Sequence, residues 1–174
     1  GAMLITGGRV EAIRSDFIRN SADGNGGAIS MNGGEAMFEG CLLEGNSAVA
    51  DGGALHVQRG AVVLRNGTLL RGNSATGRGD SILVEGVSAP ECSCDEQGDA
   101  QAAPQSSSSV VYELPAPLGR YINAEAGSQS MRIAVPDTDD DFPFACAPGL
   151  YGNSFDKQLT SSCSGRCLMG FYCP

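Results

Sequence analysis

The sequence predicts an all-β chain that joins a short parallel β-helix of about three turns to a small disulfide-rich module. Three observations carry this prediction. A 26-residue repeat runs through residues 1–87, apolar and polar residues alternate within each copy, and Cys residues crowd into residues 146–174. A fixed period in the twenties is typical of stacked copies of one small unit. One copy is called a rung below.

Small residues and asparagine mark the repeat. Its Gly-Ala pairs lie 26 residues apart, at Gly1-Ala2, Gly27-Ala28 and Gly53-Ala54. Each copy also contains Asn-Ser-Ala, which begins at Asn20, Asn46 and Asn73. The third copy is one residue longer than the others. Because Gly1-Ala2-Met3 is in phase with the later copies, we expect it to be native, with the chain starting inside a rung and further rungs preceding it.

Each copy predicts about three short strands, because its apolar residues alternate instead of recurring at helical spacing. Gly pairs and Asn-Ser-Ala would form the corners, since Gly and Asn tolerate positive φ angles. Equivalent side chains would then stack from rung to rung. We expect an inward apolar column of Phe17, Leu43 and Leu70. We also expect a hydrogen-bonded amide ladder, with the members Asn20, Asn46 and Asn73.

The repeat motif is Phe/Leu-x-x-Asn-Ser-Ala, about four residues, then Gly-Gly-Ala-Ile/Leu. Over residues 1–87 it resembles the repeat of the polymorphic outer-membrane protein family, whose members are adhesins with a right-handed β-helix passenger. The resemblance implies a right-handed β-helix and extracellular exposure, and it brings no catalytic residues. In the last copy Gly79-Asp80-Ser81-Ile82 replaces Gly-Gly-Ala-Ile. The motif is expected to become irregular in this way in a terminal, capping rung.

The second half of the chain divides into three further segments. Residues 88–109 are rich in Ser, Ala, Pro and Gln, which is typical of a linker or cap. Residues 110–143 contain two strand-like pieces, 110–114 and 131–135, and an open β-helix end needs a cover. We therefore expect a short β segment that caps the coil, as a hairpin or laid against its end. Residues 144–174 form the Cys-rich unit.

The Cys-rich unit resembles the ephrin-receptor-like repeat, which is itself similar to modules of the tumour-necrosis-factor-receptor class. The resemblance rests on Cys-x-Pro-Gly-x-Tyr from Cys146 and on the closing Cys163, Cys167 and Cys173. It departs from the family pattern in the three-residue gap before Cys167 and in Leu168, where Pro is usual. The resemblance implies a Cys146–Cys163 disulfide, with Cys167 paired to a later partner and Cys173 nearby or in a following unit.

The remaining cysteines and a glycosylation sequon agree with an oxidising compartment. Cys92 and Cys94 are too close to bond to each other easily, and we expect each to pair elsewhere. Asn66-Gly67-Thr68 is a candidate N-glycosylation site that falls at the insertion in the third copy. The net charge of −9 argues against nucleic-acid binding and favours plain solubility.

The sequence offers two possible metal sites, and we expect neither to bind a metal. The clustered Cys163, Cys167 and Cys173 lack the paired spacing of a structural zinc site. The single histidine, His56, falls at an outward-facing position of the coil. The acidic run 137–141 lacks the Gly and distal Glu of an EF-hand loop, so a solvated loop is favoured over calcium.

An enzymatic function is the more specific alternative to a scaffold, because many β-helices act on polysaccharides through stacked carboxylates. Stacked outward positions here give Ile18, Glu44 and Arg71, or Glu11, Glu35 and Ala61. Glu44 and Arg71 predict a cross-rung ion pair of little energetic worth. Three rungs are also short for a polymer groove. The sequence therefore favours a chain that is not an enzyme and uses no cofactor.

Taken together, these features predict a non-catalytic fragment of a large extracellular or cell-surface protein, acting as a rigid structural or adhesion scaffold. A glycan-binding β-helix module, or the non-catalytic end of a polysaccharide-active enzyme, is the alternative. The expected partners are other copies of the chain, neighbouring repeats of a longer protein, or glycans. No nucleic-acid binding and no membrane insertion of this segment are expected.

Overall fold

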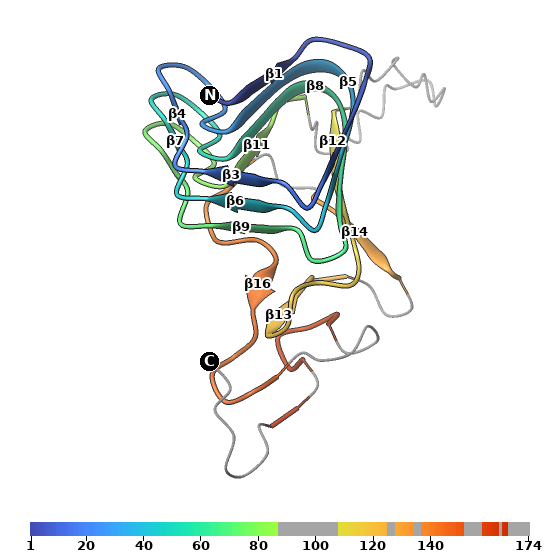
Figure 1. The fold of residues 1–174 in the computed structure, drawn as a ribbon. Helices are drawn as coiled ribbons and strands as arrows, with labels where there is room; N and C mark the ends of the chain where they lie inside the picture. The colour runs from blue at the N-terminus through green and yellow to red at the C-terminus, as the bar shows by residue number, and fades with distance from the viewer. Residues whose placement is uncertain (87–107, 125–127, 134–136, 152–157, 164, 167–174) are drawn as a thin grey trace, which may run out of the picture.

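The computed structural model describes residues 1–86, 108–124, 128–133, 137–151, 158–163 and 165–166. Most of the segment predicted as a linker, 88–109, lies outside the described residues. The chain contains strands and turns, with no helix in the described part. Figure 1 shows the first 86 residues as a stack of similar turns, which run from blue to green.

The three rungs have closely matching strands. The first rung contains β1 (Met3–Ile5), β2 (Arg9–Ile13), β3 (Asp16–Ile18) and β4 (Ser21–Ala22). The second contains β5 (Ile29–Glu39), β6 (Leu42–Glu44) and β7 (Ser47–Ala48). The third contains β8 (Leu55–Arg65), β9 (Leu69–Arg71) and β10 (Ser74–Ala75), and β11 (Ile82–Val84) begins a further turn.

Each strand pairs in parallel with its equivalent one rung away. Three stacks result: β1 and β2 on β5, then β8 and β11; β3 on β6 and β9; and β4 on β7 and β10 (Figure 1). The registers join Met3 to Ile29 and Ile29 to Leu55, as the repeat predicts. The predicted fold class is confirmed: the chain is a parallel β-solenoid of about three turns.

In the second and third rungs, two of the predicted strands merge into one bent strand, whereas β1 and β2 stay separate in the first. β5 and β8 each run for 11 residues, with a register irregularity between Met31 and Glu35. The insertion in the third rung lies between β8 and β9. Glu39 pairs with Arg65 across 26 positions, whereas Leu42 pairs with Leu69 across 27. The turn containing Asn66 and Gly67, both at positive φ, absorbs the extra residue.

Inward side chains form a continuous core through the stack. Leu43 and Leu70 are fully buried, whereas Phe17, the first member of the predicted column, is half-buried and packs edge-on against Phe38 at a 5.9 Å ring separation. A second column joins Ala12, Phe38 and Leu64. Each buried Leu or Phe contributes roughly 1.5–3 kcal/mol to folding. Phe17 is less covered because within the described residues only the second rung packs on its rung.

The segment after residue 108 covers the last rung. β12 (Ser109–Glu113) adds to β8 in parallel, and β14 (Ser130–Arg132) pairs with β12 in an antiparallel hairpin arrangement. β15 (Asp137–Thr138) runs antiparallel on β11, and Phe142 bridges to Leu70. Residues 109–143 therefore both continue the stack and close its end.

The Cys-rich unit is attached to this cap. β13 (Arg120–Tyr121) pairs with β16 (Phe144–Ala145), and both lie beyond β9, away from the first rung (Figure 1). Phe144 contacts the rings of Tyr121 and Phe142. Buried Gln158 accepts a hydrogen bond from the Ala116 amide and donates to the carbonyls of Ala116 and Pro117. These contacts fix the unit to the end of the coil.

The two glycines of the Gly-Gly motif are required for different physical reasons. Its first member has a φ near +69° at Gly26, Gly52 and Gly79, a conformation that side chains disfavour. Its second member has no room: a Cβ at Gly27 would collide with the Gly53 carbonyl oxygen, and one at Gly53 with that of Asp80. Asp80 replaces the second Gly in the last copy, where no further turn of the coil stacks on it within the described residues.

Replacing Gly53 by Ala should therefore destabilise the coil by about 3 kcal/mol, because the added methyl meets backbone atoms that cannot move independently. Gly24→Ala is the matched control, since nothing lies within 4 Å of a Cβ there. Urea unfolding of both variants tests this. Equal stabilities of Gly53→Ala and Gly24→Ala would contradict the close approach of the rungs.

Candidate functional site: the polar ladders of the coil

The structure brings Asn20, Asn46 and Asn73 together as one column. The side-chain amide of Asn20 donates to Oδ1 of Asn46 at 2.9 Å, and that of Asn46 donates to Oδ1 of Asn73 at 2.9 Å. The backbone N–H groups of Asn20 and Asn46 donate to the same two oxygens. Each accepting oxygen therefore receives two hydrogen bonds from the preceding rung.

The same amides also satisfy carbonyl groups at the corner. Nδ2 of Asn46 donates to the Phe17 carbonyl at 2.8 Å, and Nδ2 of Asn73 donates to the Leu43 carbonyl at 3.0 Å. Asn46 is fully buried and Asn73 is 8 % exposed. Because the Asn46 and Asn73 amides are withdrawn from water, losing either member leaves buried partners unsatisfied.

A second ladder stands at the neighbouring corner and was not recognised in the sequence. Its members are Ser15, Cys41 and Thr68, which stack although their residue types differ. The Cys41 thiol lies 3.3 Å from the Ala12 carbonyl, and the Thr68 hydroxyl donates to the Phe38 carbonyl at 2.8 Å. The Cys41 N–H in turn donates to Thr68 Oγ1 at 3.2 Å. Cys41, a free thiol, thus acts here as a small corner residue.

A third ladder runs in the opposite sense, with acceptors in the earlier rung. Asn25 Oδ1 accepts from the Asp51 N–H at 3.1 Å, and Asp51 Oδ1 accepts from the Arg78 N–H at 2.8 Å. The backbone hydrogen bond from Arg78 is the main reason that the pKa of Asp51 lies below its ordinary value, and the Arg78 guanidinium adds to the effect.

Ion pairs link the rungs on the outer surface. Arg71 and Glu44 lie 2.9 Å apart, at the positions predicted for a cross-rung pair. Arg65 binds Glu39 at 2.8 Å and lies 4.0 Å from Glu113. Hydrogen bonds from Asn66 first, and from Arg65, hold the pKa of Glu39 below its ordinary value. Asn66, the candidate glycosylation site, is itself exposed.

His56, predicted at an outward-facing position of the coil, stacks on Ser30 and Leu83 as expected but is buried by other parts of the chain. The residue is 2 % exposed, because the corner bearing Asn25 folds beside β8 and Glu85 lies on the next turn. His56 Nε2 is 3.0 Å from a Glu85 carboxylate oxygen and 3.4 Å from Asn25 Nδ2. Its Nδ1 has no hydrogen-bond partner in the described structure. Leu83, at the stacked position, is also buried.

Two carboxylates of the acidic run 137–141 bind different backbone N–H groups. Asp139 accepts from the Asp80 N–H at 3.2 Å, and Asp141 accepts from the Gly72 N–H at 2.8 Å. The other Asp141 oxygen lies 3.4 Å from Arg120. These two side chains therefore cap backbone N–H groups of the last rung. Within the described ranges, no three His, Cys, Asp or Glu side chains are placed to hold a metal ion.

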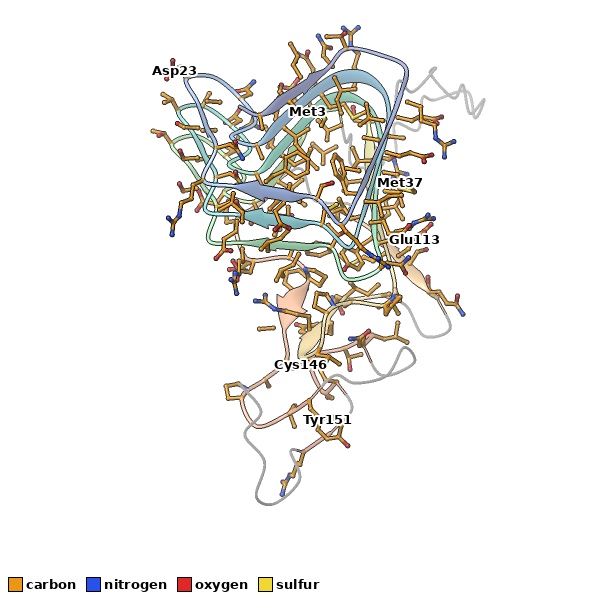
Figure 2. All side chains as sticks on the ribbon, viewed as in Figure 1. Met3, Asp23, Met37, Glu113, Cys146 and Tyr151 are labelled. Atoms are coloured by element: carbon orange, nitrogen blue, oxygen red, sulfur yellow. A yellow bond between two sulfur atoms is a disulfide. The ribbon has the colours of Figure 1, made fainter. Side chains whose placement is uncertain are left out.

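The cysteines outside the coil fall into two groups. Cys146 and Cys163 form a disulfide with a Cα–Cα distance of 6.0 Å, in the Cys-rich unit below the coil (Figure 2). The other cysteines singled out as disulfide candidates lie outside the described residues: Cys92, Cys94, Cys167 and Cys173.

The outer face of β2, β5, β8 and β12 carries an open groove of about 340 Å³. Half-exposed Met37 and Val63 lie at its floor, with Arg9, Glu35 and Glu113 among the flanking charges. Figure 2 shows Met37 and Glu113 on this side of the coil.

The predicted stack of Glu11, Glu35 and Ala61 is wrong by two residues in the first rung. Arg9 pairs with Glu35, which pairs with Ala61, whereas Glu11 pairs with Met37. Arg9 binds Glu11 at 2.7 Å.

Comparison with known proteins gives one short match. Residues 14–32 match the family model of the Chlamydia polymorphic membrane protein repeat. No curated protein and no solved structure matches the chain. The match and the observed solenoid together support a β-helix of the polymorphic membrane protein type. They suggest a fragment of a surface or outer-membrane protein with a β-helix scaffold. Among the described residues, no helix is long and apolar enough to span a membrane.

Asn46→Leu should lower the free energy of unfolding by about 3 kcal/mol, because it leaves amide and carbonyl groups of both neighbouring rungs unsatisfied. Glu44→Gln, two residues away on the surface, should cost less than about 0.5 kcal/mol. Urea denaturation compares the two. Similar, negligible losses in both variants would contradict a structural role for the ladder.

The lowered pKa of Glu39 predicts a pH-dependent contribution. A carboxyl whose pKa is depressed on folding stabilises the protein above its ordinary value of 4.5, and this contribution is lost as the pH falls through the folded-state pKa. The stability difference between wild type and Glu39→Gln should therefore shrink from neutral pH to about pH 3. Urea midpoints measured across this range test it, and a constant difference would contradict the assignment.

Proposed function

We propose that this chain is a non-catalytic scaffold in a large extracellular structural or adhesion protein of the polymorphic membrane protein type. One observation carries the proposal: the polar side chains that stack between rungs are engaged in holding those rungs together. The asparagine ladder, the Ser15–Cys41–Thr68 ladder and the Asp51 corner all hydrogen-bond to backbone of a neighbouring rung. Chemistry on a substrate would need such groups to be free.

The proposed location is the cell surface or the extracellular space. The family match supports it, because that family is described as membrane proteins. The Cys146–Cys163 disulfide supports it too, since disulfides persist in oxidising compartments. Exposed Asn66 is positioned to accept a glycan if the protein passes through a glycosylating compartment.

We assign the Cys-rich unit the role of extending the scaffold. Its resemblance to the ephrin-receptor-like repeat favours a stalk module built on disulfides instead of a large core. The bond between Cys146 and Cys163 closes it locally, while Gln158 and Phe144 join it to the cap. Mechanical force applied to the coil would then be transmitted through the cap to the Cys-rich unit.

The surface best suited to adhesion is the outer face of β2, β5, β8 and β12. Met37, Val63 and Val111 form a half-exposed apolar row across three of these strands, with charged side chains on both sides. A row of this kind can bury apolar area against a partner protein while the charges select the orientation. The groove there is lined without an aromatic side chain in the described structure, which favours a protein partner over a glycan.

Two alternative functions predict different ligands or a different place for the active residues. A glycan-binding module would recognise sugars on this same face, and a polysaccharide-active enzyme would carry its active rungs elsewhere. The acidic balance of the chain still argues against nucleic acid as a partner. The partners we propose are further repeats of the same kind along the stack and a protein surface at the outer face.

The proposal is tested by binding of the labelled chain to cultured animal cells and immobilised matrix proteins. The double variant Met37→Glu, Val63→Glu should bind at least about tenfold more weakly, because charge replaces the apolar row. Leu118→Ser is the control, since Leu118 is 81 % exposed and lies in the cap. Unchanged binding by the double variant would overturn the adhesive face. Binding that is competed by free oligosaccharides would favour the glycan module.

A further inference from the structure

The outer face of β2, β5, β8 and β12 carries an excess of negative charge. Equivalent residues of the four strands stack in register, so their outward side chains form rows that cross the sheet. The central row is apolar over Met37, Val63 and Val111. Around it, the face carries the two guanidinium groups of Arg9 and Arg65 and the four carboxylates of Glu11, Glu35, Glu39 and Glu113.

Both guanidinium groups of this face are already neutralised by carboxylates of the same face. Arg9 binds Glu11 at 2.7 Å. Arg65 donates two hydrogen bonds to one carboxylate oxygen of Glu39, at 2.8 Å and 3.0 Å. Among the described residues that line the groove, these two arginines are the only cations, and Arg132 on β14 lies beyond them. The remaining carboxylates of the face therefore have no cation of their own.

The two remaining carboxylates stand on opposite sides of the apolar row. Glu35 is exposed and has no ion-pair partner in the part of the chain that the structure describes. Glu113 lies 4.0 Å from Arg65, at the limit of an ion pair. Glu35 stands in line with Ala61 and Ser109, which places it two strands and four residues away from Glu113. At about 4.8 Å per strand and about 3.3 Å per residue, the two Cα atoms lie about 16 Å apart.

Charge argues against three possible occupants of this face. The whole chain has a net charge of −9, so a second copy is not favoured there. Residues 88–107 of the chain itself contain four acidic residues and no Lys or Arg. Either would bring like charges to Glu35 and Glu113, which suppresses association, and a sulfated or uronic-acid glycan would do the same. Charge complementarity therefore favours a different, positively charged protein.

We propose that the outer face of β2, β5, β8 and β12 binds a basic protein surface. The apolar centre of that surface covers Met37, Val63 and Val111, and two Lys or Arg side chains about 16 Å apart pair with Glu35 and Glu113. Covering the apolar row removes water from around both carboxylates, which strengthens each new ion pair. Their diagonal placement fixes one orientation of the partner. This inference rests on the proposed adhesive function and names the chemistry of its partner.

The test measures the binding of three synthetic peptides to the 174-residue chain by fluorescence anisotropy. All three share one apolar centre, and their ends carry arginine, glutamate, or citrulline, which has the shape of arginine without its charge. Wild type should bind the arginine peptide at least about tenfold more tightly than the citrulline peptide, and the glutamate peptide least. In the double variant Glu35→Gln, Glu113→Gln this preference should disappear, while the citrulline peptide should bind as it does to wild type.

The double variant Asp23→Asn, Asp140→Asn is the matched control. Both residues are exposed and have no ion-pair partner within the described ranges. Figure 2 shows Asp23 on the opposite side of the coil from Met37. Each double variant changes the net charge from −9 to −7, because two carboxylates are lost. The control should keep the preference for the arginine peptide, and circular dichroism should show all three proteins folded.

Four results would overturn the proposal: no binding of the arginine peptide by wild type, equal binding of the arginine and citrulline peptides, a preference that persists in Glu35→Gln, Glu113→Gln, or an equal loss of preference in both double variants. If that double variant bound cells as tightly as wild type, the basic partner would be refuted and the adhesive face would stand. If the arginine peptide bound as expected but cells and matrix proteins did not, adhesion would be refuted and the basic partner would stand.

Discussion

The close stacking of backbone on backbone is the constraint on which the rest of this molecule depends. Strands of neighbouring rungs lie about 4.8 Å apart, so any residue that faces along the stack must fit beneath its own equivalent. At Gly27 and Gly53 this leaves no space for a Cβ. At Asn46 it places amide above amide, and at Thr68 a hydroxyl beneath the backbone of another rung. The 26-residue period of the sequence reflects this constraint.

Departures from the period occur where the stack can tolerate them. The extra residue of the third rung is accommodated at Asn66-Gly67, where a Cβ on Gly67 would meet nothing within 4 Å. Asp80 replaces a motif glycine at the last turn, where its carboxylate instead accepts a hydrogen bond from the Ala75 N–H. At the far end, Asp139 and Asp141 supply acceptors that a further rung would otherwise provide.

Much of the coil could be predicted because each inference used the repeat itself. Position within a copy is enough to predict that Gly27 aligns with Gly53 and Asn20 with Asn46. It also predicts the ion pair between Glu44 and Arg71. The burial of His56 could not be predicted, because alternation gives the side of a strand and not what folds over it. The Ser15–Cys41–Thr68 ladder was missed because its members share hydrogen-bonding capacity and not residue type. The cap could be expected only in outline, since pairing of β12 with β8 spans a long sequence separation and leaves no period to detect.

The central claim is that buried polar ladders, and not surface contacts, hold the rungs in register. Hydrogen exchange of side-chain amides measured by NMR tests it most directly, because it reports on the ladder protons themselves. The account predicts that the Nδ2 protons of Asn46 and Asn73 exchange as slowly as the backbone amides of buried Leu43 and Leu70. The exposed side chain of Asn123 supplies the fast reference. Exchange of the Asn46 amide protons at the rate of Asn123 would contradict the ladder.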